Sequence, residues 1–345
     1  MNQIEKFIEY VNNNFLGEIH THISFKDLTT LKIGGQIACL YSPKTLDDLL
    51  IGFRYLIENK IAYFIIGNGS NVLAADKDFE MVVISLKKLS KVTKITNNKF
   101  IVQAGMNDSK LAMSLAKQGY TKIEFLSVIP GTLGGAIYMN ASAYGVQMKD
   151  IVKEVTYLTE QGTIQTYKEE ELDFSYRHSK FQDLKGIIVG ALIEVEEAHI
   201  KKLPLEKIAT LRRRKKETQP LHLLSAGSTF KNGTNYEAWK VIDDLGDRGY
   251  QLAGAMVSNA HTNYLVNTGH ATYLDMTQLI SKIKLDALNK YNIEKRPLSK
   301  LLGMGELTIT RYMDGQLPSK KYSDYLYEIL NDEQKMKSIV KKNHT

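Results

Sequence analysis

The feature that most constrains the fold is a stretch at positions 130–145 that is rich in glycine, alanine and other small residues. The run includes Gly131, Gly134 and Gly135. Glycine lets backbone N–H groups approach a phosphate without obstruction by a Cβ atom. Because such a run usually packs against something large and flat, we expect it to line a binding surface.

A second glycine-rich segment, residues 67–71 with the sequence Gly-Asn-Gly-Ser-Asn, directly follows a short apolar run at 61–66. Taken alone, this segment could be an ordinary tight turn. Together the two segments favour a dinucleotide spread across one mixed domain. Their spacing is not the Gly-x-Gly-x-x-Gly of a Rossmann unit, which argues against a nicotinamide Rossmann enzyme.

The rest of the pattern mixes helices and strands. At residues 45–60 the apolar side chains fall at helical spacing, with Thr45 and Asp48 placed as an N-cap and its partner. The apolar run at 61–66 predicts a buried strand. Further strands are expected at 81–86, 100–104, 154–158, 163–167 and 187–195, with a turn at 161–162. Further helices are expected from Pro204 to a basic run at 212–216, and at 237–245 and 276–291.

Composition excludes several classes of protein. The 345 residues are 43% hydrophobic and 24% charged, which is enough for two or three domains with hydrophobic cores. No apolar run reaches the roughly 18 residues of a membrane span, and the N-terminus does not resemble a signal peptide. A single cysteine, Cys39, rules out an intramolecular disulfide framework. We therefore expect a cytoplasmic protein that does not bind a membrane. The sequence does not indicate its oligomeric state.

Five motifs stand out along the chain, at residues 30–35, 67–71, 129–145, 176–179 and 225–232. They occur in the order found in the UDP-N-acetylenolpyruvoylglucosamine reductase (MurB) family, and the chain resembles the type II form of this family over about residues 15–294. The resemblance implies an α+β fold. Its parts would be a FAD-binding region of the PCMH (vanillyl-alcohol-oxidase-like) type at 1–200, with subdomains at about 1–86 and 87–200, and a substrate-binding domain at 201–294.

The resemblance also implies the cofactors FAD and NADPH. The implied substrate is a UDP-linked enolpyruvyl sugar, which is reduced to UDP-N-acetylmuramate in peptidoglycan precursor synthesis. In the family the glycine loops hold FAD. The matching cofactor positions are Gly67, Asn68, Gly69, Ser70, Asn71, Gly131, Thr132, Gly134, Gly135, Asn140 and Gly145.

Two residues match the catalytic groups of the family. Arg177 matches the arginine that meets the charge developing on the substrate carboxylate, although on its own it could be a surface salt-bridge residue. Ser228 matches the serine that protonates the substrate carbon, and a helix-cap or turn serine is the plain alternative. The implied substrate-binding residues are Tyr176, Lys231 and Asn232.

The other charged residues predict less. The basic run at 212–216 could help to bind a diphosphate, but most of it is expected to be solvated. His178, His222 and His261 have no carboxylate or cysteine at ligand spacing, so we expect no metal site.

The chain departs from the family at several positions. Leu298 stands about where the family has a glutamate that helps to stabilise the developing enolate, and neither Glu294 nor Glu306 sits in the matching motif. The family usually has glycine, glycine and proline at the positions of Val128, Ser142 and Gly233. A Cβ atom where the backbone needs positive φ or a close approach would crowd or loosen the flavin loops.

Residues 295–345 resemble the helix-turn-helix of Xre-like and antitoxin-type repressors, which implies a small all-α tail able to bind DNA. Thr308, Thr310 and Arg311 would then lie on or near the recognition helix. The tail holds ten Lys or Arg against six Asp or Glu, a net charge of +4, which weakly favours nucleic acid. The alternative is a helical cap that replaces the last strand of the family.

Three functions are compatible with these features. The first is an NADPH-dependent flavin reductase with an appended helical tail. The second is a ligand sensor that has lost turnover and is fused to a DNA-binding tail, which the missing glutamate favours. The third is a flavin oxidase of another substrate, and the intact motifs around Arg177 and Ser228 argue against it.

Overall fold

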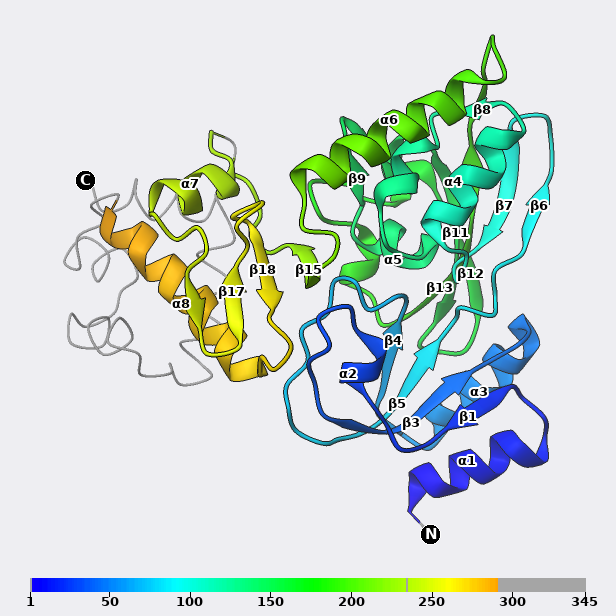
Figure 1. Cartoon of the computed structure of the whole chain (residues 1–345). Coiled ribbons are helices and arrows are strands. Elements are labelled where there is room, and N and C mark those ends of the chain that lie inside the picture. Colours follow the sequence, from blue (N-terminus) through cyan, green and yellow to red (C-terminus); the bar gives the residue numbers. More distant parts are fainter. Residues whose placement is uncertain (1, 234, 291–345) are drawn as a thin grey trace, which may run out of the picture.

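The computed structural model describes residues 2–233 and 235–290. Three larger β-sheets, each covered by helices, make up this part of the chain (Figure 1). Within it, no helix is both long and apolar enough to cross a membrane. The expected helix-turn-helix at 295–345, with Thr308, Thr310 and Arg311, lies outside the described residues, as does Leu298.

The first sheet is built from the N-terminal part of the chain. Its strand order is β1-β3-β5-β4, and β2 pairs with β3. The three strands β3, β5 and β4 are parallel. The elements are α1 (Gln3–Asn13), β1 (Glu18–His20), β2 (Ile23–Ser24), α2 (Phe25–Leu28), β3 (Gln36–Ser42), α3 (Leu46–Glu58), β4 (Tyr63–Ile66) and β5 (Phe79–Ser85).

Helix α3 begins at the predicted N-cap. The Asp48 N–H donates to Thr45 Oγ1 at 3.0 Å, and the Thr45 N–H donates to Asp48 Oδ2 at 2.9 Å. This reciprocal pair satisfies backbone donors that a helix start leaves without intrahelical partners. The buried side chains of α3, Leu49, Phe53 and Leu56, then pack into the core beneath the sheet.

The prediction of a buried strand at 61–66 is wrong in one respect. The strand forms as β4, but it is the last strand of its sheet, and Phe64 is 38% exposed. An edge strand has a neighbour on one side alone, so its apolar side chains need not be enclosed. Residues 61–66 instead line the large cleft described below.

The second sheet is antiparallel, with strand order β12-β11-β13-β7-β6. Its strands are β6 (Val92–Lys94), β7 (Lys99–Gln103), β11 (Val152–Thr159), β12 (Ile164–Lys168) and β13 (Gly186–Glu194). Two small two-stranded sheets lie in the same part of the chain. One pairs β8 (Tyr120–Thr121) with β14 (Glu196–Glu197), and the other pairs β9 (Ser142–Ala143) with β10 (Val146–Gln147). Its helices are α4 (Asp108–Lys117), α5 (Leu133–Tyr138) and α6 (Leu203–Thr218), with 3-10 turns at η1 (Glu124–Val128), η2 (Met148–Asp150), η3 (Glu169–Glu171) and η4 (Lys180–Gln182). The predicted strands and the turn at 161–162 are confirmed to within two residues at most ends.

Helix α6 starts with Pro204 in its first turn and carries the basic run, as predicted. It packs against α4 and η1, and its Ile208 is buried in the core of the preceding sheets. The helix therefore lies on the first part of the chain, and residues 219–223 lead from it to the third sheet (Figure 1).

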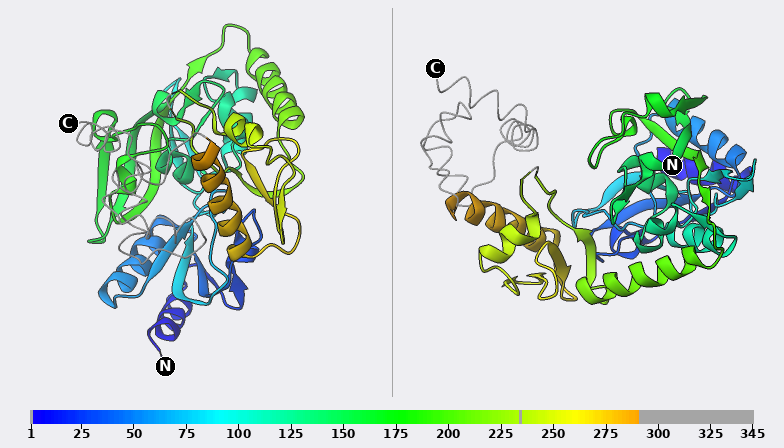
Figure 2. Two further views of the ribbon diagram at one scale, coloured as in Figure 1. Left: turned by 90° about the vertical axis from the view of Figure 1, so that its left-hand side faces the viewer. Right: turned by 90° about the horizontal axis from the view of Figure 1, so that it is seen from above.

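The third sheet is smaller and has the antiparallel order β15-β18-β17-β16. Its elements are β15 (Leu224–Ser228), α7 (Ala238–Asp244), β16 (Gln251–Leu252), β17 (Ala255–Val257), β18 (Tyr264–Asn267) and α8 (Tyr273–Lys290). Helix α8 covers the sheet and buries Met276, Leu279 and Ile283. Figure 2 shows this unit set beside the two larger sheets, with a narrow connection between them.

The segment at 30–33 joins the third sheet to the rest of the molecule. Leu31 and Ile33 are buried in the core of the third sheet and not in that of their own neighbours in sequence. The Thr30 hydroxyl donates to the Ser225 carbonyl at 2.6 Å, and the Asn267 amide donates to the Leu31 carbonyl at 2.9 Å. Residues 30–33 therefore connect the third sheet to the preceding part of the chain.

Candidate active site

A cleft of about 1820 Å³ lies between the glycine loops and the third sheet. Sites for one small molecule usually enclose about 300–1,000 Å³, so this cleft has room for two ligands. Both glycine segments line it, as do Arg177 and Ser228. Residues from the first sheet, the second sheet, α6 and the third sheet therefore meet around one space.

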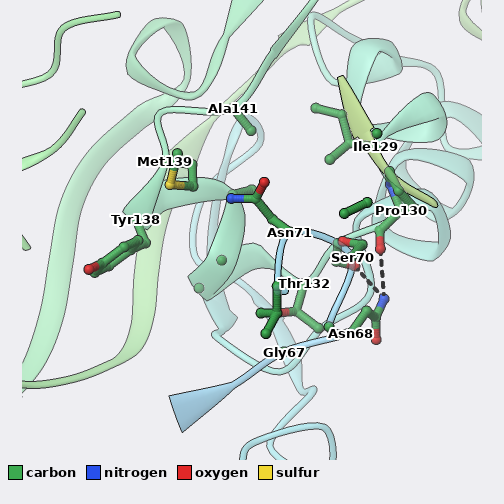
Figure 3. A pocket seen from close by; sticks show the side chains of 18 of the residues that line it. Gly67, Asn68, Ser70, Asn71, Ile129, Pro130, Thr132, Tyr138, Met139 and Ala141 are labelled. Atoms are coloured by element: carbon green, nitrogen blue, oxygen red, sulfur yellow. Dashed lines mark hydrogen bonds between the residues drawn. The ribbon is translucent and has the colours of Figure 1, made fainter. Parts of the chain in front are cut away.

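The loop at 67–71 is bound to the loop at 130–135. The Asn68 side-chain amide donates to the Gly131 carbonyl at 2.8 Å and to the Pro130 carbonyl at 3.3 Å (Figure 3). Gly69 has φ +64°, and a Cβ there would collide with the backbone of Leu28 and lie 2.8 Å from Thr29 Cα. A glycine is therefore required at 69 by both conformation and space.

The loop at 130–135 is anchored to the end of β7. The backbone N–H groups of Leu133 and Gly134 donate to the carbonyls of Met106 and Ala104, both at 2.9 Å. A Cβ at Gly134 would lie 3.0 Å from the Ala104 Cβ, so the close approach depends on glycine. The two loops form a shallow cradle of backbone, and a flat, phosphate-bearing cofactor such as FAD fits a cradle of this kind.

Asp108 lies directly behind this cradle. Its carboxylate is fully buried, and neither oxygen has a hydrogen-bond partner within residues 2–233 and 235–290. A Cβ at Gly131 would lie 2.5 Å from Asp108 Oδ2. Burial raises the pKa of Asp108 well above its ordinary value. The charged form is disfavoured here because nothing replaces its hydration.

Two of the expected cofactor positions have other roles. Asn140 is 1% exposed, and its amide donates to the Ser175 carbonyl at 2.8 Å and to Gln147 Oε1 at 2.9 Å. It therefore holds the segment that carries Arg177. Gly145 has φ +85° and connects β9 to β10. Neither residue belongs to the described lining of the cleft.

Arg177 enters the cleft from a strained turn. Its backbone has φ +58°, a left-handed conformation that is uncommon for residues other than glycine and that nine other described residues share. The guanidinium donates from Nη1 to Ser142 Oγ at 3.1 Å and lies over the Tyr176 ring, 5.6 Å from its centroid. Ser142, one of the departures from the family, therefore contacts the expected catalytic arginine.

The departures at 128 and 142 do not strain the loops. Val128 lies in a 3-10 helix and Ser142 in a strand, and both conformations have negative φ. The expected crowding by a Cβ at a positive-φ position therefore does not occur at either residue. At the third departure, a Cβ on Gly233 would run into the Tyr236 ring.

Ser228 ends strand β15 and lies opposite Tyr264 of β18. The Tyr264 hydroxyl donates to Gln219 Oε1 at 2.6 Å, and the Tyr264 side chain is 7% exposed. Gln219 and Tyr264 line the cleft beside Ser228, although the sequence patterns did not single them out. Their spacing along the chain carries no signal, because a β-pair between distant strands brings them together.

The expected substrate-binding residues lie at the margin. The Asn232 backbone N–H donates to the Tyr176 hydroxyl at 3.1 Å, so the structure brings these two residues together. Tyr176, Lys231 and Asn232 are exposed and are not part of the described lining of the cleft.

The basic run on α6 makes more contacts than expected. Arg212 donates to Ser109 Oγ at 2.7 Å, and the Arg214 guanidinium lies over the Tyr144 ring at 5.2 Å. Lys215 donates to the Val128 carbonyl, and burial lowers its pKa. The expectation of a mostly solvated run is confirmed, because four of its five residues are exposed; Lys215 alone is partly buried, where α6 lies along the first part of the chain. Arg214 and Lys215 add positive charge to the cleft wall.

Comparisons with known proteins agree with this arrangement. A family model described as an FAD binding domain matches residues 37–168. A second, the C-terminal domain of UDP-N-acetylenolpyruvoylglucosamine reductase, matches residues 219–297. The second match begins after α6 and includes Ser228, Lys231 and Asn232.

Relatives match over most of the chain. UDP-N-acetylenolpyruvoylglucosamine reductase from Caldanaerobacter subterraneus subsp. tengcongensis is 40% identical over 287 residues, which cover 83% of this chain and 94% of the relative. The protein of the same name from Clostridioides difficile is 38% identical over 306 residues, covering 88% and 99%. The crystal structure of UDP-N-acetylenolpyruvylglucosamine reductase (MurB) from Thermus caldophilus superposes with a TM-score of 0.67 at 29% identity and covers 77% of this chain and 94% of that one.

Proposed function

The chain belongs to the UDP-N-acetylenolpyruvoylglucosamine reductase (MurB) family, and from this premise we propose how its cleft carries out the reaction. The protein is a FAD- and NADP-dependent oxidoreductase that reduces UDP-N-acetylglucosamine enolpyruvate to UDP-N-acetylmuramate, a step of peptidoglycan precursor synthesis. FAD, when bound, passes a hydride that originates from NADPH to the vinyl group of the substrate. The ligand sensor without turnover is not favoured by these relatives.

One observation carries the proposal. The backbone cradle at 67–71 and 130–135 faces Arg177 and Ser228 across a single cleft that is large enough for two ligands. The cradle would hold the FAD diphosphate through backbone N–H groups, and its glycines would admit the cofactor to close approach. The hydrogen bond from Asn68 to Gly131 would hold the loop at 67–71 against the loop at 130–135.

Arg177 would bind the substrate carboxylate. A guanidinium offers two parallel donors that match the two oxygens of a carboxylate. Negative charge spreads onto this carboxylate when hydride reaches the neighbouring vinyl group, so a fixed cation there stabilises the transition state more than the ground state.

Ser228 would supply the proton that completes the reduction. It stands at the end of β15, directly after Gly227, whose φ of +81° lies in the irregular part of the strand pairing between Ser225 and Ser228, and both residues line the cleft. Arg214 and Lys215 on α6, together with Lys231, would bind the diphosphate of the nucleotide sugar. Tyr176 and Asn232, already in contact, would close the same side of the substrate.

We test this proposal anaerobically, with the purified protein and its visible flavin spectrum. NADPH should reduce the flavin, and UDP-N-acetylglucosamine enolpyruvate should then reoxidise it within seconds. Flavin that is reduced and never reoxidised by this substrate would contradict the proposal. The variant Leu298→Glu places a glutamate at the position where the family has one. Faster reoxidation of the flavin in this variant would mean that the parent protein lacks a carboxylate that assists the reaction.

Two further assignments rest on sequence or packing and stay proposals. The cytoplasmic location follows from the sequence alone. For the division of the chain we move the expected boundary from 201 to about 219, because α6 packs on the preceding sheets and the second family match begins there.

For residues 295–345 we retain the helix-turn-helix as a DNA-binding proposal. Titration of the full chain with the duplex upstream of its own gene, over a range of salt concentrations, tests it. Phosphate contacts make affinity fall steeply with salt. Binding no tighter than that of an unrelated basic protein would contradict it.

A further inference from the structure

Tyr264 is the buried neighbour of Ser228 in the cleft. The two residues are directly opposite each other in the β15–β18 pair, so their side chains lie on the same face of the sheet, and the Ser228 hydroxyl acts against burial by lowering the pKa of the Tyr264 phenol. The phenol also donates to Gln219 Oε1 at 2.6 Å. Gln219 at the end of α6, Tyr264 on β18 and Ser228 on β15 thus follow one another along the cleft, and the row ends at the candidate proton donor.

Ser228 needs such a neighbour. An aliphatic hydroxyl is a poor acid, and once it has given its proton to the substrate carbon it becomes an alkoxide that must be reprotonated. A phenol is a much stronger acid, with an ordinary pKa of about 10. Burial raises the pKa of Tyr264 to about 12, so the phenol stays protonated at neutral pH and remains available as a donor.

We propose that Tyr264 is a positioning residue that orients the Ser228 hydroxyl and returns a proton to it during the reduction. The proposal rests on the proposed function, since it assumes that Ser228 protonates the substrate. Gln219 holds the phenol in place through its carboxamide oxygen, and the same amide carries N–H donors that can meet the oxygen once its proton has left.

The proton transfers balance. Hydride adds to the vinyl carbon, and the electron pair of the double bond moves to the carbon that bears the carboxylate. That carbon forms a C–H bond as the Ser228 O–H bond breaks. The Ser228 oxygen takes the proton of the Tyr264 hydroxyl, and the phenolate takes a proton from water in the cleft. One hydride and one proton are added to the substrate, and both side chains return to their starting state.

A purely structural role for Tyr264 predicts a different effect of removing its hydroxyl. The Tyr264 ring packs edge-on against His261, with centroids 5.0 Å apart. Phenylalanine keeps this ring and its burial and removes the hydroxyl alone. If packing is the whole role of Tyr264, Tyr264→Phe should leave both half-reactions unchanged.

The experiment separates the half-reactions in stopped flow. In Tyr264→Phe, NADPH should reduce the flavin at the parent rate, while reoxidation by the enolpyruvyl substrate slows by about tenfold or more at saturating substrate. Tyr250→Phe, in the same domain, is the matched control and should behave as the parent in both steps. Reoxidation of Tyr264→Phe within twofold of the parent would overturn the proposal.

A double-mutant comparison tests whether Tyr264 acts through Ser228. Ser228→Ala should slow reoxidation strongly, and adding Tyr264→Phe to it should cause little further loss, because the partner is already gone. An equal further loss in both backgrounds would show that Tyr264 acts independently of Ser228 and would overturn the proposal.

A spectroscopic measurement keeps the inference distinct from the reductase assignment. In protein labelled with ¹³C at the tyrosine ζ-carbon, the Tyr264 resonance is identified by its loss in Tyr264→Phe. Ser228→Ala should shift this resonance, and Ser225→Ala should not. An unmoved resonance in Ser228→Ala overturns the proposed action of Tyr264 on Ser228. If the parent fails to reduce the substrate, the function fails, while this measurement still decides the coupling of the two hydroxyls.

Discussion

The two walls of the cleft are built by different means. The cofactor wall, residues 67–71 and 130–135, consists of backbone and small side chains tied by hydrogen bonds to Ala104, Met106 and one another. The substrate wall, Arg177, Ser228 and Tyr264, consists of side chains from separate segments; Arg177 and Tyr264 are each hydrogen-bonded to another side chain, and Ser228 lies opposite Tyr264. We therefore expect the cofactor wall to be disrupted by substitutions that add atoms, and the substrate wall by substitutions that remove a hydrogen bond.

The largest effect is expected from Gly69→Ala on the cofactor wall. The new Cβ would meet the backbone of Leu28 in a conformation with positive φ, so we expect a loss of about 3 kcal/mol in the free energy of unfolding and release of the flavin. Gly145→Ala is the matched control. It has φ +85°, and no atom of the described residues lies within 4 Å of the added Cβ, so it should cost about 1 kcal/mol. Equal losses in urea unfolding would remove the steric argument.

On the substrate wall, Arg177→Lys keeps the charge and loses the two parallel donors. We expect reoxidation of reduced flavin by the substrate to slow about a hundredfold, while NADPH still reduces the flavin at the parent rate. The control is Arg213→Lys, on the exposed face of α6. A parent-like rate in Arg177→Lys would mean that the arginine was assigned wrongly.

A smaller, pH-dependent effect is expected from Asp108, the one buried carboxylate behind Gly131. Burial raises the pKa of Asp108 in the native state, so the native state keeps a proton that the unfolded chain releases above about pH 4. The contribution of this group to stability is complete below that pH and is lost as the pH rises toward the raised native pKa. Asp108→Asn should therefore gain stability relative to the parent as the pH is raised from 4 to 8. Parallel stability curves from urea unfolding would contradict this.

The smallest effect is expected at Ser142, which contacts Arg177 of the substrate wall. Ser142→Gly removes the hydroxyl that accepts from Arg177 at 3.1 Å. We expect a loss of about 1 kcal/mol, or roughly fivefold, in the rate of flavin reoxidation. Ser142→Ala should match Ser142→Gly, and Ser142→Thr should restore the rate. A difference between the alanine and glycine variants would point to the backbone instead of the hydroxyl.

Local structure was predictable from the sequence where its causes are local. The cap of α3 depends on Thr45 and Asp48, which are three residues apart, and both hydrogen bonds form as predicted. Strand β4 was predictable as a strand and not as an edge, because the order of strands in a sheet depends on which distant segments pair. The contacts of Arg212, Arg214 and Lys215 were missed for a similar reason, since helical spacing does not reveal which surface a helix lies against.

The sequence by itself indicated the cofactor wall, because glycine-rich loops such as 67–71 and 130–135 allow the close backbone approach that a phosphate-bearing ligand needs. It also named Arg177 and Ser228 through the motifs around them. Only the tertiary structure decided what holds these side chains. Ser142 and Arg177 are 35 residues apart, and folding brings them within hydrogen-bonding reach. Tyr264 lies on a different strand from Ser228, and strand pairing places the two opposite each other. A hydrogen bond between distant segments leaves no periodic pattern along the chain, because its geometry is set by the packing of whole elements.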